Sequence, residues 1–384
     1  MKKYIYADKF FRKTGIEENG YLEIKDGKFG SFQTEKPSDS DEIIDFSGKF
    51  VAPGLVDTHI HGLLNFDIMD NTFEAVNTIS KGLLKYGVTS FLPTTLTDSI
   101  ERLDESVENI AYSKDKVEGA KIQGIFLEGP FFTEKHKGAQ NEKYFKDPEI
   151  EILKKWQEKS GNLIRKIAIA PERDGAAEFA KFASENNVTV ALGHSAATFE
   201  EAKAVVDAGA SVFVHTYNGM SPLSHREPGM VGAAMALKNT YAELICDGHH
   251  VNPVAAKIMM DVKSRDNVAL ITDCMRAGAM ENGEYTLGEF DVIVKDGVAR
   301  LKTGSLAGSV LTMNSAIKNV VDWDIATLEE AIKMASYVPA LSCHIEDSCG
   351  SIDCGMPADF IVIDEKLNVY NTYIDGACKY SIAK

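Results

Sequence analysis

The stretch Ala52-Pro53-Gly54-Leu55-Val56-Asp57-Thr58-His59-Ile60-His61-Gly62 joins an apolar run to two histidines in alternate positions. A run of this kind, bounded by glycines, is typical of a buried β-strand. Alternate side chains of a strand point to the same face, so His59 and His61 would project together and could ligate one metal ion. A His-x-His pair alone is weak support, since paired histidines are at least as common on surfaces and in cores.

The middle of the chain repeats this apolar pattern, with amphipathic helical segments between the repeats. Eight apolar runs occur, at residues 50–61, 88–95, 121–128, 164–172, 188–195, 211–217, 242–247 and 268–273. Strands that alternate with helices are typical of a parallel sheet with crossover helices. Eight of them predict an α/β fold, a (β/α)8 TIM-like barrel, whose active sites lie at the carboxyl ends of the strands. A doubly wound open sheet is the structural alternative.

The two ends of the chain are rich in β-strand patterns and differ from the middle. Short strand patterns with turns such as Lys25-Asp26-Gly27-Lys28 precede residue 50, and similar patterns follow residue 351. We therefore expect residues 1–50 and 351–384 to form one small β-sandwich domain, and residues 51–350 to form the barrel domain. The turn signals Asn282-Gly283 and Asp296-Gly297 predict a β-hairpin inserted around residues 284–302.

The composition of the 384 residues excludes several classes of protein. The formal net charge is −16, whereas nucleic-acid-binding proteins need a basic surface. No uncharged apolar run approaches the roughly 18 residues of a membrane-spanning helix, and no signal peptide is evident. The six cysteines include no C-x-x-C pair, which favours free thiols in a reducing compartment. We expect a cytoplasmic protein with no nucleic-acid partner and no membrane partner.

Potential metal ligands stand at the ends of five of the eight runs. They are His59 and His61 in the first run, Glu128 in the third, His194 in the fifth, His215 in the sixth and Asp273 in the eighth. Any one of them is more often a core residue, but six unrelated residues would require the same coincidence at five strand ends. Barrel closure would gather them around one mouth. Four imidazoles and two carboxylates suit a divalent transition metal, Zn²⁺ or Fe²⁺, rather than Ca²⁺ or Mg²⁺.

Several stretches resemble the N-acetylglucosamine-6-phosphate deacetylases of the amidohydrolase superfamily. Besides residues 52–62, they are Leu127-Glu128-Gly129-Pro130-Phe131, Leu192-Gly193-His194-Ser195, His215-Thr216-Tyr217-Asn218-Gly219-Met220, Arg226-Glu227-Pro228-Gly229, Cys246-Asp247-Gly248-His249-His250-Val251, Thr272-Asp273, Leu306-Ala307-Gly308-Ser309 and residues 355–362. The resemblance spans nearly the whole chain.

The resemblance implies a function and a set of metal ligands. It implies removal of the acetyl group from N-acetylglucosamine 6-phosphate, which gives glucosamine 6-phosphate and acetate. Glu128, His194 and His215 would bind one metal ion, and His59 with His61 a second, so that each subunit holds one or two. A metal-activated hydroxide would attack the amide carbonyl. Asp273 would act as the general acid/base.

The resemblance also implies a substrate site and a partner. Arg226 would bind the phosphate with the backbone amides of Asn218 and Gly219, although an ion pair with Glu227 is the commoner fate of such an arginine. His250 would contact the substrate as well. Further contacts would come from Ala139, Gln140, Leu306, Ala307 and Gly308. Members of the family usually form homodimers, so a homodimer is expected.

Three other functions stay open at this point. A deacetylase for N-acetylgalactosamine 6-phosphate would differ in one hydroxyl orientation, which no motif distinguishes. Another amidohydrolase, such as one cleaving a cyclic amide, is a second alternative. A catalytically inactive barrel that only binds a sugar phosphate is a third, but it should have lost a ligand or Asp273, and all are present.

Overall fold

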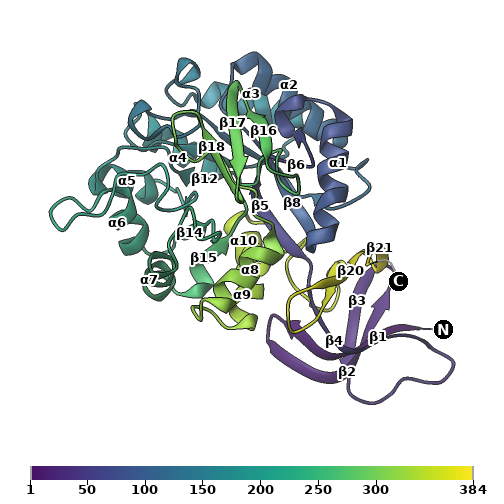
Figure 1. Cartoon of the computed structure of the whole chain (residues 1–384). Helices are drawn as coiled ribbons and strands as arrows, with labels where there is room; N and C mark the ends of the chain where they lie inside the picture. Colours follow the sequence, from purple (N-terminus) through teal and green to yellow (C-terminus); the bar gives the residue numbers. More distant parts are fainter. Residues whose placement is uncertain (1, 383–384) are drawn as a thin grey trace.

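The barrel of this protein begins at Leu55, where the apolar run of the sequence becomes a strand in the computed structural model. The structure describes residues 2–382. The barrel strands are β5 (Leu55–Ile60), β8 (Val88–Thr95), β10 (Ile125–Phe131), β11 (Ile164–Ile169), β12 (Thr189–Leu192), β13 (Val212–Phe213), β14 (Tyr241–Leu244) and β15 (Val268–Leu270). They pair in parallel in chain order, and a short strand, β9 (Lys121–Ile122), pairs with β8. All eight correspond to the predicted runs, and Figure 1 labels β5, β8, β12, β14 and β15 among them.

The first and last barrel strands meet at their carboxyl ends. The amide of Asp273 donates to the carbonyl of His59 at 2.9 Å. The hydroxyl of Thr272 donates to the buried carboxylate of Asp57, with 2.6 Å between Oγ1 and Oδ2. Helix α10 (Tyr337–Ser342) packs against both strands. The sheet is therefore a nearly closed barrel, which confirms the predicted fold class against the open-sheet alternative.

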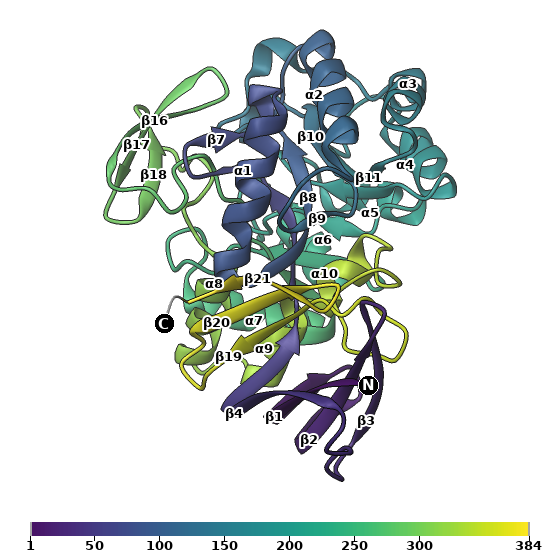
Figure 2. The same cartoon turned by 90° about the vertical axis from the view of Figure 1, so that its right-hand side faces the viewer.

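Helices surround the barrel (Figures 1 and 2). They are α1 (Phe73–Leu83), α2 (Ile100–Ser113), α3 (Ile150–Ser160), α4 (Ala176–Glu185), α5 (Phe199–Asp207), α6 (Gly229–Ala236), α7 (Pro253–Lys263), α8 (Met313–Asp322) and α9 (Leu328–Met334). Short 3-10 turns are η1 (Ile68–Asp70), η2 (Leu84–Tyr86), η3 (Glu134–His136), η4 (Glu142–Tyr144) and η5 (Arg265–Asn267). Thr198 and Thr327 begin α5 and α9 with complete capping boxes. No helix within residues 2–382 is long and apolar enough to cross a membrane.

The chain ends form a second sheet beside the barrel, as predicted (Figure 2). Its strands are β1 (Lys3–Arg12), β2 (Gly15–Lys25), β3 (Lys28–Gln33), β4 (Glu42–Pro53), β19 (Phe360–Ile363), β20 (Val369–Ile374) and β21 (Ala377–Ser381), in the order β21-β20-β19-β4-β1-β2-β3. The sheet curls strongly. Three strands lie between β3 and β19, yet the ring centroids of Phe29 on β3 and Phe360 on β19 are only 6.1 Å apart. Both halves of the sheet thus bury side chains in one core.

Two boundaries differ from the sequence-based expectation. The first apolar run, residues 50–61, contains two strands, because β4 continues to Pro53 and pairs there with Phe360 of β19. Both strands are buried, so their apolar patterns run together and only Gly54 separates them. The insertion around residues 284–302 has three strands rather than a two-stranded hairpin: β16 (Gly283–Leu287), β17 (Phe290–Lys295) and β18 (Val298–Leu301). A two-residue hairpin, β6 (Gly62–Leu63) and β7 (Phe66–Asp67), follows β5.

Candidate metal centre

The six predicted metal-site residues gather at one mouth of the barrel, at the carboxyl ends of the strands. His59 lies on β5 and His61 just after it, and Glu128 lies on β10. His194, His215 and Asp273 come two or three residues after β12, β13 and β15. Each is at least nine-tenths buried. His194, His215 and Asp273 have φ values of 45°, 29° and 50°. Left-handed backbone costs a non-glycine residue of order 1–3 kcal/mol and collects at functional sites.

One half of the cluster consists of Glu128, His194 and His215. The Nδ1 atom of His194 lies 3.1 Å from the carbonyl of His136, and Nδ1 of His215 lies 3.1 Å from that of Asn218. A carbonyl only accepts, so both Nδ1 atoms carry the proton and both Nε2 atoms present a lone pair. These Nε2 atoms lie 3.1 Å apart, and 3.3 and 3.1 Å from Oε1 of Glu128. Three converging lone pairs repel one another unless a cation lies between them.

The other half consists of His59, His61 and Asp273, with Glu128 between the halves. Nε2 of His61 lies 3.2 Å from Oε2 of Glu128 and 3.3 Å from Oδ1 of Asp273. Nε2 of His59 lies 3.3 Å from Oε1 of Glu128 and 3.6 Å from Asp273. Within residues 2–382 this buried nitrogen has no hydrogen-bond partner. The ligand atoms of His59, His61 and Asp273 fall within 4.8 Å of one another, as do those of His59, Glu128 and His215.

The electrostatics of the cluster call for a positive charge. Burial alone would raise the pKa of Glu128, but the imidazoles around it, His59 first among them, hold this pKa well below its ordinary value. Burial likewise opposes ionisation of Asp273, yet His59 and His61 lower its pKa. The carboxylates in turn overcome the effect of burial on His59 and raise its pKa to about 9 in the metal-free protein. The residues present therefore fit one or two divalent cations.

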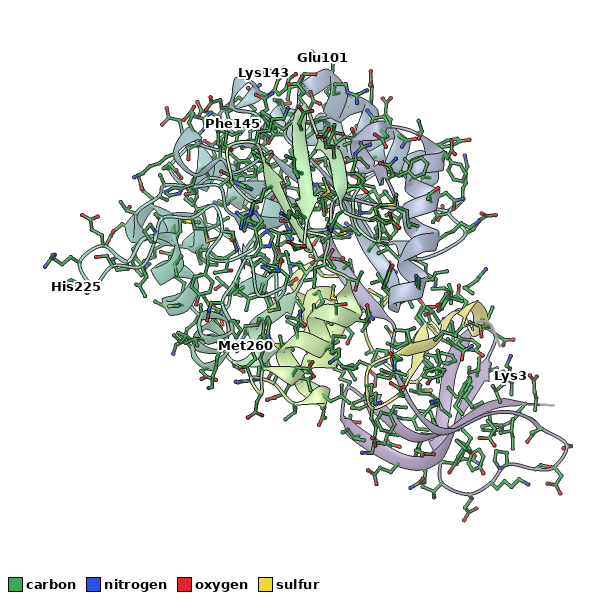
Figure 3. All side chains as sticks on the ribbon, in the orientation of Figure 1. Lys3, Glu101, Lys143, Phe145, His225 and Met260 are labelled. Carbon is green, nitrogen blue, oxygen red and sulfur yellow. The ribbon has the colours of Figure 1, made fainter. Side chains whose placement is uncertain are left out.

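A cavity of about 240 Å³ lies above the cluster and contains most of the predicted substrate residues. Its wall includes Ala139, Gln140, Asn218, Gly219, His250, Leu306 and Gly308, together with Leu96, Leu287 and Ser305. The inserted sheet thus contributes Leu287 to the wall. Two predicted residues do not line it. Ala307 is fully buried, while Arg226 is exposed on a loop that projects from the barrel, where Figure 3 labels its neighbour His225.

The side chain of Arg226 lies apart from both the Glu227 carboxylate and the cavity. It forms no ion pair with Glu227 or any other residue between 2 and 382, and it is not part of the cavity wall. The loop that carries it, residues 222–227, is exposed throughout. Arg226 therefore lies outside this chain's own cavity.

Three groups orient residues of the cluster or the cavity through contacts that the sequence did not predict. The carboxylate of Asp247 lies 2.6 Å from Nδ1 of His250 and fixes that ring at the cavity. Gln140 donates to Oε2 of Glu128 at 2.7 Å, and its own carbonyl accepts the amide proton of Thr97 at 3.1 Å. The spacing Asp247-x-x-His250 was visible in the sequence, whereas the contact of Gln140 with Glu128 depends on the loop between them.

The third group is a pair of buried charges beneath the metal cluster, Lys166 on β11 and Glu243 on β14. The two side chains form an ion pair and are fully inaccessible. Glu243 also faces Nδ1 of His59 at 3.3 Å. Their only sequence signal was a charged residue within a predominantly apolar run.

Comparisons with known proteins agree with this geometry. Residues 50–379 match the amidohydrolase family. The chain is 38% identical to the N-acetylglucosamine-6-phosphate deacetylase of Vibrio furnissii, over 96% of this chain and 90% of the relative. It is 36% identical to the N-acetylgalactosamine-6-phosphate deacetylase of Escherichia coli O157:H7, over 98% of this chain and 99% of that one.

A solved structure is similar along the whole chain. It is a variant of the N-acetyl-D-glucosamine-6-phosphate deacetylase of Mycobacterium smegmatis in complex with N-acetyl-D-glucosamine-6-phosphate. It superposes with a TM-score of 0.93 at 28% sequence identity and covers 99% of this chain and 100% of the other. Fold, ligand cluster and sequence agree: the chain belongs to the metal-dependent amidohydrolase family and, within it, to the N-acetylglucosamine-6-phosphate deacetylases.

Proposed function

We propose that this protein hydrolyses the acetamide of N-acetylglucosamine 6-phosphate to glucosamine 6-phosphate and acetate. The observation that carries this proposal is the convergence of Glu128, His194 and His215 with Asp273 on the floor of one cavity. The 38% identity to a relative of that activity supports the choice of sugar. The 36% identity to an N-acetylgalactosamine-6-phosphate deacetylase supports the epimer as a second candidate.

The metal centre would hold two divalent transition-metal ions, Zn²⁺ or Fe²⁺. Glu128, His194 and His215 would bind the first, and His59, His61 and Asp273 the second. A bound ion would supply Lewis acidity, which lowers the pKa of a water molecule and polarises the amide carbonyl.

Asp273 would move the proton that the reaction requires. Its pKa is lowered by His59 and His61 although burial opposes this, so it enters the reaction as a carboxylate. It would accept the proton of the attacking water as the C–O bond forms. It would then deliver that proton to the amide nitrogen as the C–N bond breaks, because an amine leaves poorly unless it is protonated.

The wall residues would hold the sugar and its phosphate. His250, oriented by Asp247, presents Nε2 to the cavity and would donate to or accept from the substrate. The backbone amides of Asn218 and Gly219 would bind phosphate oxygens, while Ala139, Gln140, Leu306, Ala307 and Gly308 would enclose the sugar.

In a homodimer, Arg226 would bind the phosphate of the substrate held in the cavity of the neighbouring subunit. Its exposed position outside its own cavity supports this arrangement. The exposed face of α7 offers an apolar surface for the subunit contact, because Val254, Ile258 and Val262 follow one another at helical spacing and are 48–67% exposed. All six cysteines are free, four of them buried, which supports a cytoplasmic location.

Acetate release from three substrates tests the proposed activity. We expect the highest kcat/KM for N-acetylglucosamine 6-phosphate, and a value at least about 100-fold lower for unphosphorylated N-acetylglucosamine, since charged hydrogen bonds contribute about 1.5–3 kcal/mol each. A higher kcat/KM for N-acetylgalactosamine 6-phosphate would favour the epimer. Binding of either phosphate without acetate release would support the inactive barrel.

A further inference from the structure

The barrel interior beneath His59 holds two opposite charges. Lys166 and Glu243 are 0% exposed and lie on β11 and β14, two strands that are not neighbours. The interior of such a barrel is normally packed with branched apolar side chains. Buried ion pairs are weak evidence for stability, because desolvation offsets their attraction. A pair retained at this place therefore suggests another role.

The two oxygens of the Glu243 carboxylate have different partners: Oε1 faces Lys166 and Oε2 faces His59. Nζ of Lys166 donates to Oε1 of Glu243 and lies 3.4 Å from the carbonyl of Thr58 and 3.9 Å from the ring centroid of Phe126. The hydroxyl of Thr58 donates to the same Oε1 at 3.4 Å. The second oxygen, Oε2, lies 3.3 Å from Nδ1 of His59.

This arrangement fixes the state of one imidazole. A carboxylate held by a lysine only accepts, so Nδ1 of His59 is the nitrogen that carries the proton. Nε2, the nitrogen left to bind a metal, then points between Glu128, at 3.3 Å, and Asp273, at 3.6 Å. Partners of this kind orient metal-binding histidines and make them stronger ligands.

Among these four histidines, and within residues 2–382, only His59 has a charged side chain at Nδ1. His194 and His215 are held by backbone carbonyls. Nδ1 of His61 is buried and has no hydrogen-bond partner among the described residues. Any effect of the ion pair is therefore confined to the half of the cluster that contains His59.

We propose that Lys166 and Glu243 are positioning residues that set the tautomer and orientation of His59 and thereby create the second metal site. This inference rests on the two-metal centre proposed above. The lysine neutralises the carboxylate inside the barrel, and the carboxylate presents one oxygen to His59. Neither residue contacts the cavity, so neither touches the substrate.

Zn²⁺ titration of the metal-free protein, with calorimetry and elemental analysis, tests this inference. The wild-type protein should bind two equivalents. The variant Lys166→Met/Glu243→Leu, which replaces the pair by apolar side chains of similar size, should bind the second equivalent at least about 10-fold more weakly and the first unchanged. Its melting temperature without metal should equal or exceed that of the wild type, because such replacements are often neutral or stabilising.

Two further variants separate positioning from packing. Lys166→Met/Glu243→Gln retains an acceptor for Nδ1 of His59 and should recover part of the second-metal affinity. Lys263→Met is the control. It removes another largely buried lysine, which donates to the carbonyl of Leu237 and the hydroxyl of Thr240, and this variant should bind both metal equivalents normally. Nitrogen NMR shifts of histidine-labelled protein loaded with Zn²⁺ should show His59 protonated at Nδ1 in the wild type and altered in Lys166→Met/Glu243→Leu.

The outcomes distinguish this inference from the proposal beneath it. A wild-type protein that binds a single equivalent contradicts the two-metal centre and the inference together. If Lys166→Met/Glu243→Leu binds both equivalents of Zn²⁺ with wild-type affinity, this contradicts the inference alone and leaves the two-metal centre intact.

Discussion

The Nε2 atoms of His194 and His215 face each other at 3.1 Å, although each ring already donates its Nδ1 proton to a backbone carbonyl. Neither nitrogen can donate to the other while both rings are neutral. Glu128 adds a carboxylate oxygen to the same point. The folded chain thus holds three acceptors together at the expense of strained backbone at both histidines, and a cation is what relieves their repulsion.

Replacing Glu128 with Gln should remove the metal from this point. The amide is neutral and brings an N–H group toward the imidazoles. We expect metal affinity to fall at least about 100-fold, since even the loss of an outer partner costs 10–100-fold. Elemental analysis after dialysis against buffered Zn²⁺ measures this. Glu118→Gln, at an exposed carboxylate, is the control and should hold the wild-type amount. Equal metal content in both variants would show that Glu128 is not a metal ligand.

Replacing Asp273 with Asn should separate catalysis from binding of the first metal. The amide cannot accept and return the proton, so kcat should fall by about 10²–10⁴. His194 and His215 keep their contacts with Glu128, so at least one equivalent of metal should remain. Steady-state kinetics and metal analysis on the same preparation provide both numbers. A near-normal kcat would exclude Asp273 as the proton carrier.

Much of the fold and of the metal cluster was predictable because strand order dictates both. In a barrel of parallel strands, residues at the carboxyl ends of successive strands must meet at one mouth. His59, Glu128 and Asp273 are far apart in the chain, yet their common position after an apolar run was sufficient to group them. The strand patterns at the two chain ends predicted the terminal sheet only in outline, since the break at Gly54 leaves no gap in the apolar pattern.

The remainder depends on contacts that no local pattern records. Lys166 and Glu243 are 77 positions apart, and only the closed barrel makes each the partner of the other. A charged residue in a strand more often faces solvent, so neither could be assigned to the interior beforehand. Arg226 was singled out by its motif, but the motif does not state that its loop leads away from its own cavity.

Metal binding at the His59 side should weaken as the pH falls. The pKa of His59 is raised to about 9 in the metal-free protein, chiefly by Glu128 and Asp273 against the opposing effect of burial. A metal ligand must be a neutral imidazole, so binding below this pH displaces a proton. Apparent Zn²⁺ affinity should therefore rise by up to about tenfold per pH unit between pH 6 and 8. Competition with a chelator, corrected for the chelator's own protonation, tests this. A flat profile would contradict a ligand role for His59.

Replacing Arg226 with Ala should affect substrate binding more than chemistry. Loss of a charged hydrogen bond to phosphate costs about 1.5–3 kcal/mol, so KM should rise about 10- to 150-fold with kcat nearly retained. The matched control is His225→Ala on the same loop. Activity with the unphosphorylated sugar should not change in either variant. An unchanged KM for the phosphorylated sugar would remove Arg226 from the phosphate site.

The seam between the first and last barrel strands should depend on the hydroxyl of Thr272. It donates to the fully buried carboxylate of Asp57, whose pKa is raised by burial from 3.8 to about 6 although this bond opposes the rise. Thr272→Val should destabilise the metal-free fold by about 1–3 kcal/mol in urea unfolding. Thr89→Val is the matched control, since the buried hydroxyl of Thr89 has no partner within residues 2–382 and its loss should be neutral or stabilising.

The cost of losing the Thr272 hydroxyl should also depend on pH. Asp57 has a raised pKa in the folded protein, so its protonated form favours folding, and this contribution is lost as the pH rises through about 6. The variant leaves the ionised carboxylate with one hydrogen bond fewer, which raises the pKa further. Thr272→Val should therefore be more destabilising at pH 8 than at pH 5, while Thr89→Val shows no such difference. An equal loss at both pH values would indicate that Thr272 acts through packing rather than through Asp57.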